Sequence, residues 1–400
     1  MRDILFISMY MPYDSVPHAG GRALNYYIKT VAENATVRLL SLATRTEVQK
    51  STIQLYGVEP DYIVYDEIAH KTLKKIASVN SKFNPFHKYG NLIVEYKANA
   101  LLARLKNYKK NNYVPSTIVL QWTEIIMLID EIKKIFPTSR VIAVEEDVTY
   151  LRLMRESSRS KGSLSRGIKT IKYINEKRRE LKALQAANYI CVYNEKDKKL
   201  LCQDKLSPNK IFVLSPVFSQ YCSTRCCNHK KHDMLFYGNM GRPENYDAVI
   251  RFITNVFPQI PYEDKRLYVV GGNPEHIEKY RSQNVIITGY IENPEWYFSS
   301  CNIFVAPIYM GAGIKIKIVE AMASGIPVIT TDIGIEGIPA MDKKDYIAFK
   351  TDEDLVRLID YYFTHVDELE KIGNQGKIRI QETFDMKRVT QDYSKLVVGE

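Results

Sequence analysis

Short apolar runs alternate with helical stretches along all 400 residues of the chain, and this alternation limits the possible folds more than any other feature. Parallel strands need a crossover connection of a dozen or more residues, which is usually a helix. Runs spaced in this way predict parallel α/β sheets covered by helices. The runs of the first half are residues 3–10, 36–43, 116–122, 140–147 and 189–194, and those of the second half are residues 233–239, 266–272, 284–290, 301–308 and 326–332.

A chain of this length exceeds what one hydrophobic core usually supports, so two domains are expected. The apolar periodicity lapses between residues 215 and 232, and the link between the domains is predicted there. The predicted domains are residues 1–215 and 216–383. The run "FDMKRVTQDYSKLV" that follows is typical of an amphipathic helix, and residues 384–400 are expected to pack back on the first domain.

The most unusual turn lies in "YMGAGIKIKIVEAMASGIPVITTD", residues 309–332, where a buried strand gives way to a helix. The helix is predicted to begin after Gly313 and to end at Gly325 in a left-handed C-cap. Ligands bind at the carboxyl end of strands in an open parallel sheet, and free N–H groups at a helix start suit phosphate. Lys317 and Glu320 project to one side of this helix, where a cation suits phosphate and a carboxylate suits sugar hydroxyls. The alternative is a tight turn with an exposed ion pair.

Charge divides unevenly between the two halves of a chain whose net charge is +10. Residues 1–220 hold 35 Lys and Arg against 21 Asp and Glu, a net +14, whereas residues 221–400 hold 21 against 25, a net −4. The basic residues crowd into residues 70–88, 103–113 and 159–182. Such segments are commonly solvated helix faces, but they also suit an anionic cytoplasmic membrane leaflet. No nucleic-acid-binding signature appears, so nucleic acid is not expected as a partner.

The lengths of the apolar runs indicate the cellular compartment, and the spacing of the cysteines indicates whether a metal site is expected. No apolar stretch approaches the length of a membrane span, and the N-terminal run is too short for a signal peptide. The chain is therefore expected in the cytoplasm, with peripheral association at the inner face of the plasma membrane as a possibility. Cys222, Cys226, Cys227, His229 and His232 lie close together, but their spacing matches no familiar zinc finger or ribbon. A polar linker is expected there, and no metal site.

Four ordered motifs of the second half resemble a known family. They are "FYGNMGRPENYDAVIRFITNVFP", "YVVGG", "ITGYIENPEWYFSSCNIFVAPI" and "GAGIKIKIVEAMASGIPVITTDIGIEGI". Together they resemble the donor-binding domain of GT-B glycosyltransferases, specifically glycosyltransferase family 4 (group 1). In the first half, "HAGGRALNYYIKTVA" and "EKRRELKALQAANYICVYNEKDKKLL" are similar to the same family. The resemblance implies a GT-B fold, in which two Rossmann-like parallel α/β domains face each other across a cleft.

The resemblance also implies which residues meet a nucleotide-sugar donor. The diphosphate and donor sugar are expected at the glycine turn, the ribose hydroxyls at Glu320 and the nucleobase near the segment after Gly289. A first-domain glycine loop is expected to close over the phosphates. The implied donor-binding residues are Gly20, Gly21, Gly238, Arg242, Tyr290, Ile291, Gly311, Gly313, Lys315, Lys317 and Glu320.

Two positions depart from the family pattern. Many members carry a Glu seven residues before the equivalent of Glu320, where this chain has Ala312. Many also carry a Lys after the basic loop residue, where this chain has Asn245. Lys315 or Lys317 is expected to replace the absent cation.

The family implies a retaining transfer without a covalent intermediate. A helix N-terminus, Arg242 and Lys317 are expected to stabilise the leaving diphosphate, so no metal and no other cofactor is required. Glu145, Glu146 and Asp147 end a first-domain strand, and Asp147 is expected to orient or deprotonate the acceptor hydroxyl. Helix capping is the competing interpretation of these carboxylates. His18 lies in a loop that could also reach the acceptor.

The predicted function is a metal-independent, hexosyltransferase-type glycosyltransferase. It would move a sugar from a nucleotide-sugar donor to a glycan or lipid-linked acceptor in bacterial surface polysaccharide biosynthesis. Two alternatives remain open, namely a sugar-nucleotide epimerase of GT-B fold and a non-catalytic subunit that binds a nucleotide sugar.

Overall fold

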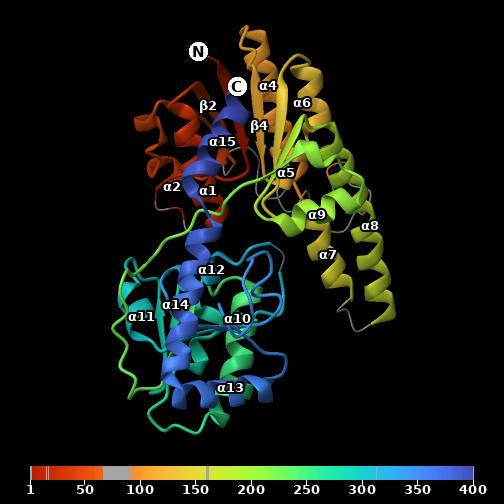
Figure 1. The fold of residues 1–400 in the computed structure, drawn as a ribbon. Helices are drawn as coiled ribbons and strands as arrows, with labels where there is room; N and C mark the ends of the chain where they lie inside the picture. The colour runs from red at the N-terminus through yellow and green to blue at the C-terminus, as the bar shows by residue number, and fades with distance from the viewer. Residues whose placement is uncertain are drawn as a thin grey trace. The chain divides into compact units, whose positions relative to one another are not determined.

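The computed structural model describes residues 2–14, 16, 18–65, 89, 92–158, 162–311 and 313–399, except for the side chain of Leu164. Ala312 and the basic segment 70–88 lie outside the described residues. The chain forms two compact units, which are Met1–Val217 with Met386–Glu400, and Phe218–Asp385. The chain therefore leaves unit 1 after its last strand, builds unit 2 and returns to unit 1 (Figure 1). The sequence predicted the link between residues 215 and 232, with the domain boundary after residue 215, and the return at residue 384.

Unit 1 is built on a seven-stranded sheet in the order β3-β2-β1-β4-β5-β6-β7. Every neighbouring pair in this sheet is parallel. The strands are β1 (Asp3–Ser8), β2 (Thr36–Ala43), β3 (Val58–Val64), β4 (Thr117–Gln121), β5 (Arg140–Val144), β6 (Tyr189–Val192) and β7 (Ile211–Val213).

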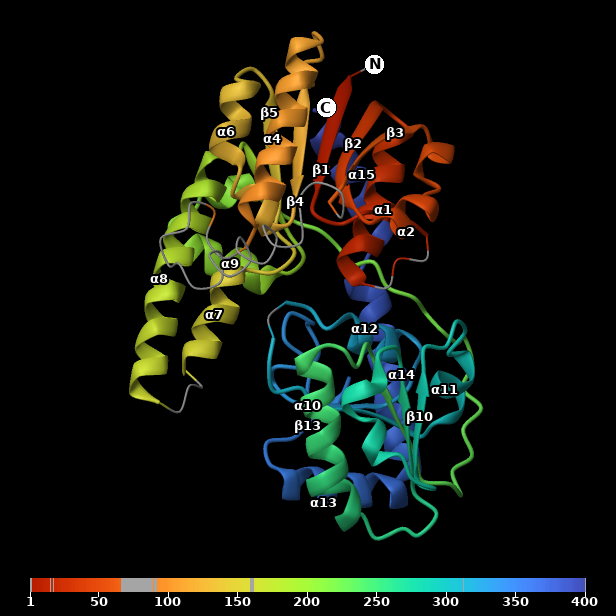
Figure 2. The same cartoon turned by 180° about the vertical axis from the view of Figure 1, so that it is seen from behind.

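Helices connect and cover these strands. They are α1 (Ala19–Ala32), α2 (Arg45–Gln49), α4 (Glu95–Lys110), α5 (Thr123–Ile126), α6 (Ile129–Ile135), α7 (Thr149–Ser158), α8 (Ser163–Ala186), α9 (Glu195–Gln203) and α15 (Met386–Val398), with the short helices η1 (Ile53–Tyr56) and η2 (Pro208–Lys210). Figure 2 shows α7 and α8 side by side, extending beyond the sheet of unit 1.

Helix α15 completes unit 1 from the far end of the chain, where it lies beside α1 (Figure 1). The ring of Tyr393 is buried and its centroid lies 4.9 Å from that of Tyr27 on α1. Arg140, at the start of β5, donates hydrogen bonds of 2.8 Å to the carbonyls of Leu396 and Val397. The apolar face of α15 and these last carbonyls thus hold it in unit 1.

Unit 2 is built on a six-stranded parallel sheet in the order β10-β9-β8-β11-β12-β13. Its strands are β8 (Asp233–Tyr237), β9 (Arg266–Val270), β10 (Val285–Gly289), β11 (Ile303–Ala306), β12 (Val328–Thr330) and β13 (Ile347–Ala348). Its helices are α10 (Pro243–Arg251), α11 (Glu295–Ser300), α12 (Ile316–Ala323), α13 (Asp352–Thr364) and α14 (Val366–Thr383), with the short helices η3 (Phe252–Val256), η4 (Phe257–Gln259), η5 (Pro274–His276) and η6 (Glu278–Tyr280).

Three described strands, β3, β7 and β13, have no counterpart among the predicted runs. All three lie at sheet edges. An edge strand has a neighbouring strand on one side only and is more exposed to solvent, so its sequence need not be a continuous apolar run. Among the described residues, no helix combines the length and the apolar content that crossing a membrane requires.

Candidate functional site

The sheet of unit 2 reverses its strand order between β8 and β11. These two strands are neighbours, yet β9 and β10 extend to one side of β8 while β12 and β13 extend to the other side of β11. Loops that leave the carboxyl ends of such a pair diverge, and ligands bind in the crevice between them. The loops concerned are residues 238–242 and the described residues 307–311 and 313–315.

Helix α12 begins later than predicted, at Ile316 with Lys315 as its N-cap, rather than directly after Gly313. The reason is that Gly311 and Gly313 both have positive φ, of 108° and 70°, which ends the strand in a turn before helical geometry begins. At the other end Gly325 has φ 76°, and the N–H groups of Gly325 and Ile326 donate to the carbonyls of Met322 and Ala321. This is a Schellman motif, as the predicted left-handed cap requires.

Lys317 lies at the crevice. Its Nζ donates to Asn245 Oδ1 on α10, and Asn245 Nδ2 donates to the carbonyl of Asn239 at 2.6 Å. A Cβ built on Gly238 would lie 3.3 Å from Lys317 Nζ, so the amine faces the turn after β8. Burial lowers the pKa of Lys317 to about 7, with Glu244 opposing this shift. A phosphate at this turn would favour the charged amine.

The structure separates the two lysines that the sequence left as alternatives. Lys315 Nζ donates to the carbonyl of Gly313 at 2.7 Å and is buried, so this side chain closes the glycine turn from within. Lys317 instead reaches the position of Asn245, where the family pattern has a lysine. The amine of Lys317, which α12 carries, therefore lies beside the α10 position at which the resemblance implies a lysine.

Glu320 lies one turn after Lys317 and is only 1% exposed. Its Oε1 accepts a hydrogen bond of 3.4 Å from the backbone N–H of Ser219, in the segment that enters unit 2. The carboxylate therefore faces the start of unit 2.

Gly271, which the motifs did not mark as a donor-binding residue, follows β9 at the same edge of the sheet. Its φ is 145°, and a Cβ at this position would lie 1.8 Å from the carbonyl oxygen of Gly238. Asn273 and Asn239 join the same two loops through a side-chain hydrogen bond of 2.9 Å. The backbones after β8 and β9 therefore touch. In the sequence, the two glycines of "YVVGG" could have indicated this close approach.

The remaining expected donor residues of unit 2 lie at the same edge of the sheet, after β8 and β10. Arg242 is the N-cap of α10, largely exposed, and its Nε lies 2.9 Å from Glu244 Oε1. Tyr290 directly follows β10 and is 69% exposed, whereas Ile291 packs against the core. An exposed ring and an exposed guanidinium thus flank the crevice on its β8 side.

Unit 1 repeats this arrangement at its own reversal of strand order, between β1 and β4. The rings of Tyr10 and His18, which follow β1, lie with that of Trp122, which follows β4. A Cβ on Gly20 would lie 3.1 Å from both Trp122 Cζ2 and Glu146 Oε2. Trp122 has φ 74°, a strained value for a large side chain and a frequent sign of a functional site.

The carboxylates after β5 differ in their surroundings. Glu146 accepts a hydrogen bond of 2.5 Å from Gln121 Nε2, and burial raises its pKa to about 8. Glu145 is buried against Thr123, and its pKa is raised well above the ordinary value by burial. Asp147, the residue chosen from sequence, is exposed. The structure brings Glu146 together with Gly20 and Trp122, and it places Asp147 outward.

His18 and Gly21 have a structural role that the sequence did not indicate. His18 is the N-cap of α1, and its Nδ1 accepts a hydrogen bond of 3.0 Å from the N–H of Gly21. A Cβ on Gly21 would lie 2.7 Å from His18 Cε1. Gly20 and Gly21 thus belong to the first turn of a helix that packs closely against the ring cluster.

Part of unit 2 matches a known protein family. Residues 231–362 match the family model described as "Glycosyl transferases group 1", so the predicted resemblance is confirmed in unit 2. An uncharacterized 44.6 kDa protein in the cps region of Klebsiella pneumoniae is 26% identical over 194 residues. That match covers 46% of this chain and 49% of the relative, about half the length of each.

Solved structures confirm the predicted GT-B fold over the whole chain. Anabaena HepE in complex with UDP has a TM-score of 0.67 and 11% identity, with 100% of both chains covered. Sucrose-phosphate synthase from Thermosynechococcus elongatus has a TM-score of 0.70 and 14% identity, with 99% of this chain and 98% of that chain covered. HepE has also been solved with UDP-glucose, at a TM-score of 0.67. The two parallel α/β units are therefore Rossmann-like domains of a GT-B protein.

Proposed function

From a GT-B chain whose second unit matches group 1 glycosyl transferases, we propose that this protein transfers a sugar from a nucleotide-sugar donor to a glycan or lipid-linked acceptor. The observation that carries the proposal is the crevice of unit 2, where Lys317 and the glycine turns after β8, β9 and β11 meet at the reversal of strand order. Backbone that approaches closely, a cation and a helix start together suit a diphosphate. That HepE holds UDP and UDP-glucose in structures of the same fold supports this donor class.

In the proposed mechanism, the positive charge of the α12 N-terminus, Lys317 and Arg242 stabilises the nucleoside diphosphate as it leaves. Glu320 binds the ribose hydroxyls and Tyr290 contacts the nucleobase. The transfer retains the anomeric configuration, as the family resemblance implies, without an enzyme nucleophile. Since protein charges stabilise the leaving group, turnover does not depend on a metal ion.

On the acceptor side, Glu146 replaces Asp147 as the proposed proton acceptor. Burial raises the pKa of Glu146 to about 8, so the carboxyl group can exchange a proton near neutral pH. It lies among Gly20, Trp122 and Gln121, where an aromatic ring and a hydrogen-bond donor can hold a sugar. His18 orients this cluster through the cap of α1.

We also propose that the acceptor is met at the inner face of the plasma membrane, during surface polysaccharide biosynthesis. The relative from a cps region supports this role. The N-terminal half of α8 supports the membrane contact, because Ile168, Ile171 and Ile174 are 61%, 53% and 43% exposed at spacings that keep them on one side of the helix. Basic residues flank them, which suits anionic lipid.

The test is a product assay with a panel of nucleotide sugars, with and without acceptor, in the presence and absence of EDTA. Nucleoside diphosphate that is released only with acceptor, at the same rate in EDTA, supports the proposal. Conversion of donor without acceptor would indicate an epimerase, and binding without any turnover would indicate a silent subunit. Turnover that is lost in EDTA and restored by Mg²⁺ or Mn²⁺ would refute the metal-independent mechanism.

A further inference from the structure

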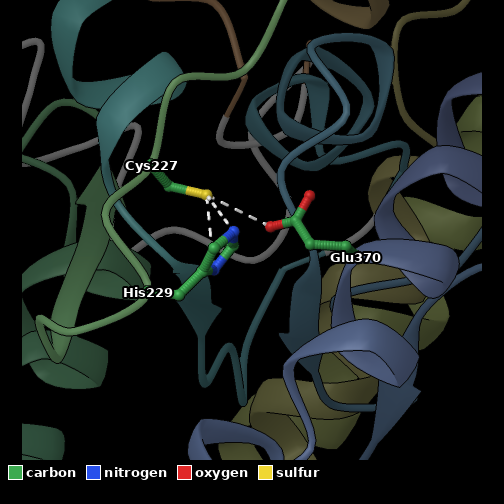
Figure 3. A group of neighbouring side chains, drawn as sticks. All are labelled: Cys227, His229 and Glu370. Carbon is green, nitrogen blue, oxygen red and sulfur yellow. Dashed lines mark hydrogen bonds between the residues drawn. The ribbon is translucent and has the colours of Figure 1, made fainter.

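Three side chains with metal-binding atoms converge in unit 2, away from the crevice. Cys227 Sγ lies 3.6 Å from His229 Nε2 and 3.3 Å from Glu370 Oε1. Figure 3 shows the thiol directed toward both the imidazole and the carboxylate, with Glu370 supplied by α14. One ligand atom from each of the three lies within 4.8 Å of the others, and no second group of this kind occurs among the described residues.

These separations suit one ion. Zinc lies about 2.3 Å from a thiolate and about 2.0–2.1 Å from imidazole nitrogen or carboxylate oxygen, usually in a tetrahedral arrangement. In such an arrangement a thiolate sulfur lies roughly 3.5–3.6 Å from a nitrogen or oxygen ligand, so the distance to His229 Nε2 fits and Glu370 Oε1 needs to move by only about 0.3 Å. His229 is exposed, so its ring can turn toward Glu370 without repacking the core.

We propose that Cys227, His229 and Glu370 bind a zinc ion that fastens the segment entering unit 2 to helix α14. The sequence favoured a polar linker here because the spacing of the cluster matches no familiar zinc finger or ribbon. Glu370, 143 residues after Cys227, adds a ligand from outside the cluster. Of the remaining members of the sequence cluster, Cys222 is buried in the core, Cys226 lies beside Ser300, and His232 stacks on Tyr262.

Arg225 also contacts the carboxylate of Glu370. Its guanidinium lies 3.2 Å from Glu370 Oε1 and donates a 3.0 Å hydrogen bond to the carbonyl of Phe298. A carboxylate has about four lone-pair sites, so Glu370 can accept from Arg225 and still coordinate an ion. Carboxylate ligands in metal sites are commonly held by such hydrogen bonds. Arg225 therefore orients Glu370 while its charge limits the affinity.

The position of the site predicts a structural role. Residues 227–229 precede β8 and Gly238 follows it, so a strand of five residues, about 16 Å at ~3.3 Å per residue, separates the ion from the crevice. Zinc should therefore raise the melting temperature without taking part in transfer. Zinc binding can therefore be absent while sugar transfer is present, and the reverse also holds.

The experiment uses the full chain, stripped of metal with a chelator and titrated with Co²⁺ and then Zn²⁺. Wild type should develop a thiolate-to-cobalt charge-transfer absorption, lose it when Zn²⁺ displaces Co²⁺, and gain thermal stability with Zn²⁺. Cys227→Ser should abolish the absorption. His229→Gln changes an exposed side chain, so the fold should be retained, and it should weaken Zn²⁺ binding by at least the ~10-fold that losing even an outer-shell partner costs. The matched control, Cys226→Ser, should behave as wild type.

Several outcomes would overturn the zinc site. Wild type without charge-transfer absorption or thermal shift leaves only a hydrogen bond from thiol to carboxylate. Zn²⁺ binding that His229→Gln leaves unchanged, or that Cys226→Ser abolishes, assigns the ion to other residues.

Discussion

Lys317 determines how donor binding responds to pH. Burial holds the pKa of this amine at about 7 in the ligand-free protein, so the group is increasingly neutral as pH rises from 7 to 9. A bound diphosphate requires the charged form, and binding must then take up a proton. We expect the Kd of a nucleoside diphosphate to rise with pH above 7 by up to about tenfold per unit. Calorimetric titration in buffers of different ionisation enthalpy measures the proton uptake.

Lys317→Met is the matched variant for this test. It keeps the length and most of the volume of the side chain but cannot titrate. Its Kd should be higher than that of wild type at pH 7 and should vary less with pH. An equal pH slope in both proteins would assign the proton to another group.

Glu320→Ala should weaken nucleotide-sugar binding while the fold is retained. The lost charge-assisted hydrogen bonds to the ribose contribute ~1.5 to 3 kcal/mol each, which is roughly 10- to 150-fold in Kd. Glu320→Gln keeps the shape and the contact with Ser219, so it tests the charge alone. If both variants bind donor as wild type does, Glu320 only holds the entry segment in place.

Glu146 and Asp147 form a natural pair for comparison. Glu146→Gln should lower kcat by about 10²- to 10⁴-fold, the typical contribution of a general base, and leave the donor Kd unchanged. Asp147→Asn should leave both quantities near wild type, because this side chain is exposed. Steady-state kinetics measures kcat and calorimetry measures the donor Kd. An equal loss of kcat in the two variants would contradict the assignment of Glu146 as the proton acceptor.

Sequence alone could predict the residue types at the crevice but not all of their partners. The glycine turn and Lys317 were visible because they share one short segment. The contact of Lys317 with Asn245 spans 72 residues, and only the sheet topology brings the two together. The choice between Glu146 and Asp147 depends on which of the two side chains points into the protein. The sequence around two adjacent carboxylates does not show this.

At the scale of elements, α8 makes the membrane proposal testable. Replacing Lys169, Lys172, Arg178 and Arg179 with Gln should reduce flotation with anionic vesicles, and high salt should have the same effect in wild type as the Debye length falls from ~10 Å at 0.1 M to ~3 Å at 1 M. Transfer to a soluble acceptor analogue should change little. The charge-matched control replaces exposed lysines of unit 1 outside the basic segments, namely Lys50, Lys134, Lys199 and Lys205.

The isoleucines of α8 give an independent measure. Replacing Ile168, Ile171 and Ile174 with Ser removes apolar area and no charge, so the residual binding should remain sensitive to salt. Wild-type protein that stays in the soluble fraction at low salt, or a quadruple variant that floats as well as wild type, would exclude this face as the contact.

The predicted elements were most reliable where a strand is buried on both faces. Every predicted run contains a strand, and all of these strands except β10 lie inside a sheet, where parallel strands are nearly continuous apolar sequences. β3 escaped prediction because Glu59, Pro60 and Asp61 interrupt it, and an edge tolerates this. β7 and β13, with three and two residues, are too short to produce a periodic signal.

At the scale of the whole molecule, α15 links the stability of unit 1 to the far end of the chain. Tyr393→Ala should destabilise unit 1 by about 3–5 kcal/mol, the usual cost of removing a buried aromatic ring. Nucleoside diphosphate binding by unit 2 should persist. Urea unfolding followed by circular dichroism, with binding measured in parallel, checks both statements.

Tyr56→Ala is the control in the same unit. That ring is about half exposed, and its loss should change the free energy of unfolding by no more than about 1 kcal/mol. A similar cost for the two variants would mean that α15 contributes little to unit 1.

The insertion of unit 2 into unit 1 has a consequence for synthesis on the ribosome. All seven strands of unit 1 are translated before residue 218, but α15 is translated only after the whole of unit 2. At about 5–20 residues per second, the interval lasts on the order of ten seconds or more. During that time the apolar surface around Tyr27 has no covering helix, whereas unit 2 is contiguous and can fold as it emerges. The nascent chain therefore exposes this apolar surface on unit 1 while unit 2 is being translated. A chaperone that binds exposed apolar surfaces should associate with the nascent chain until α15 has been translated.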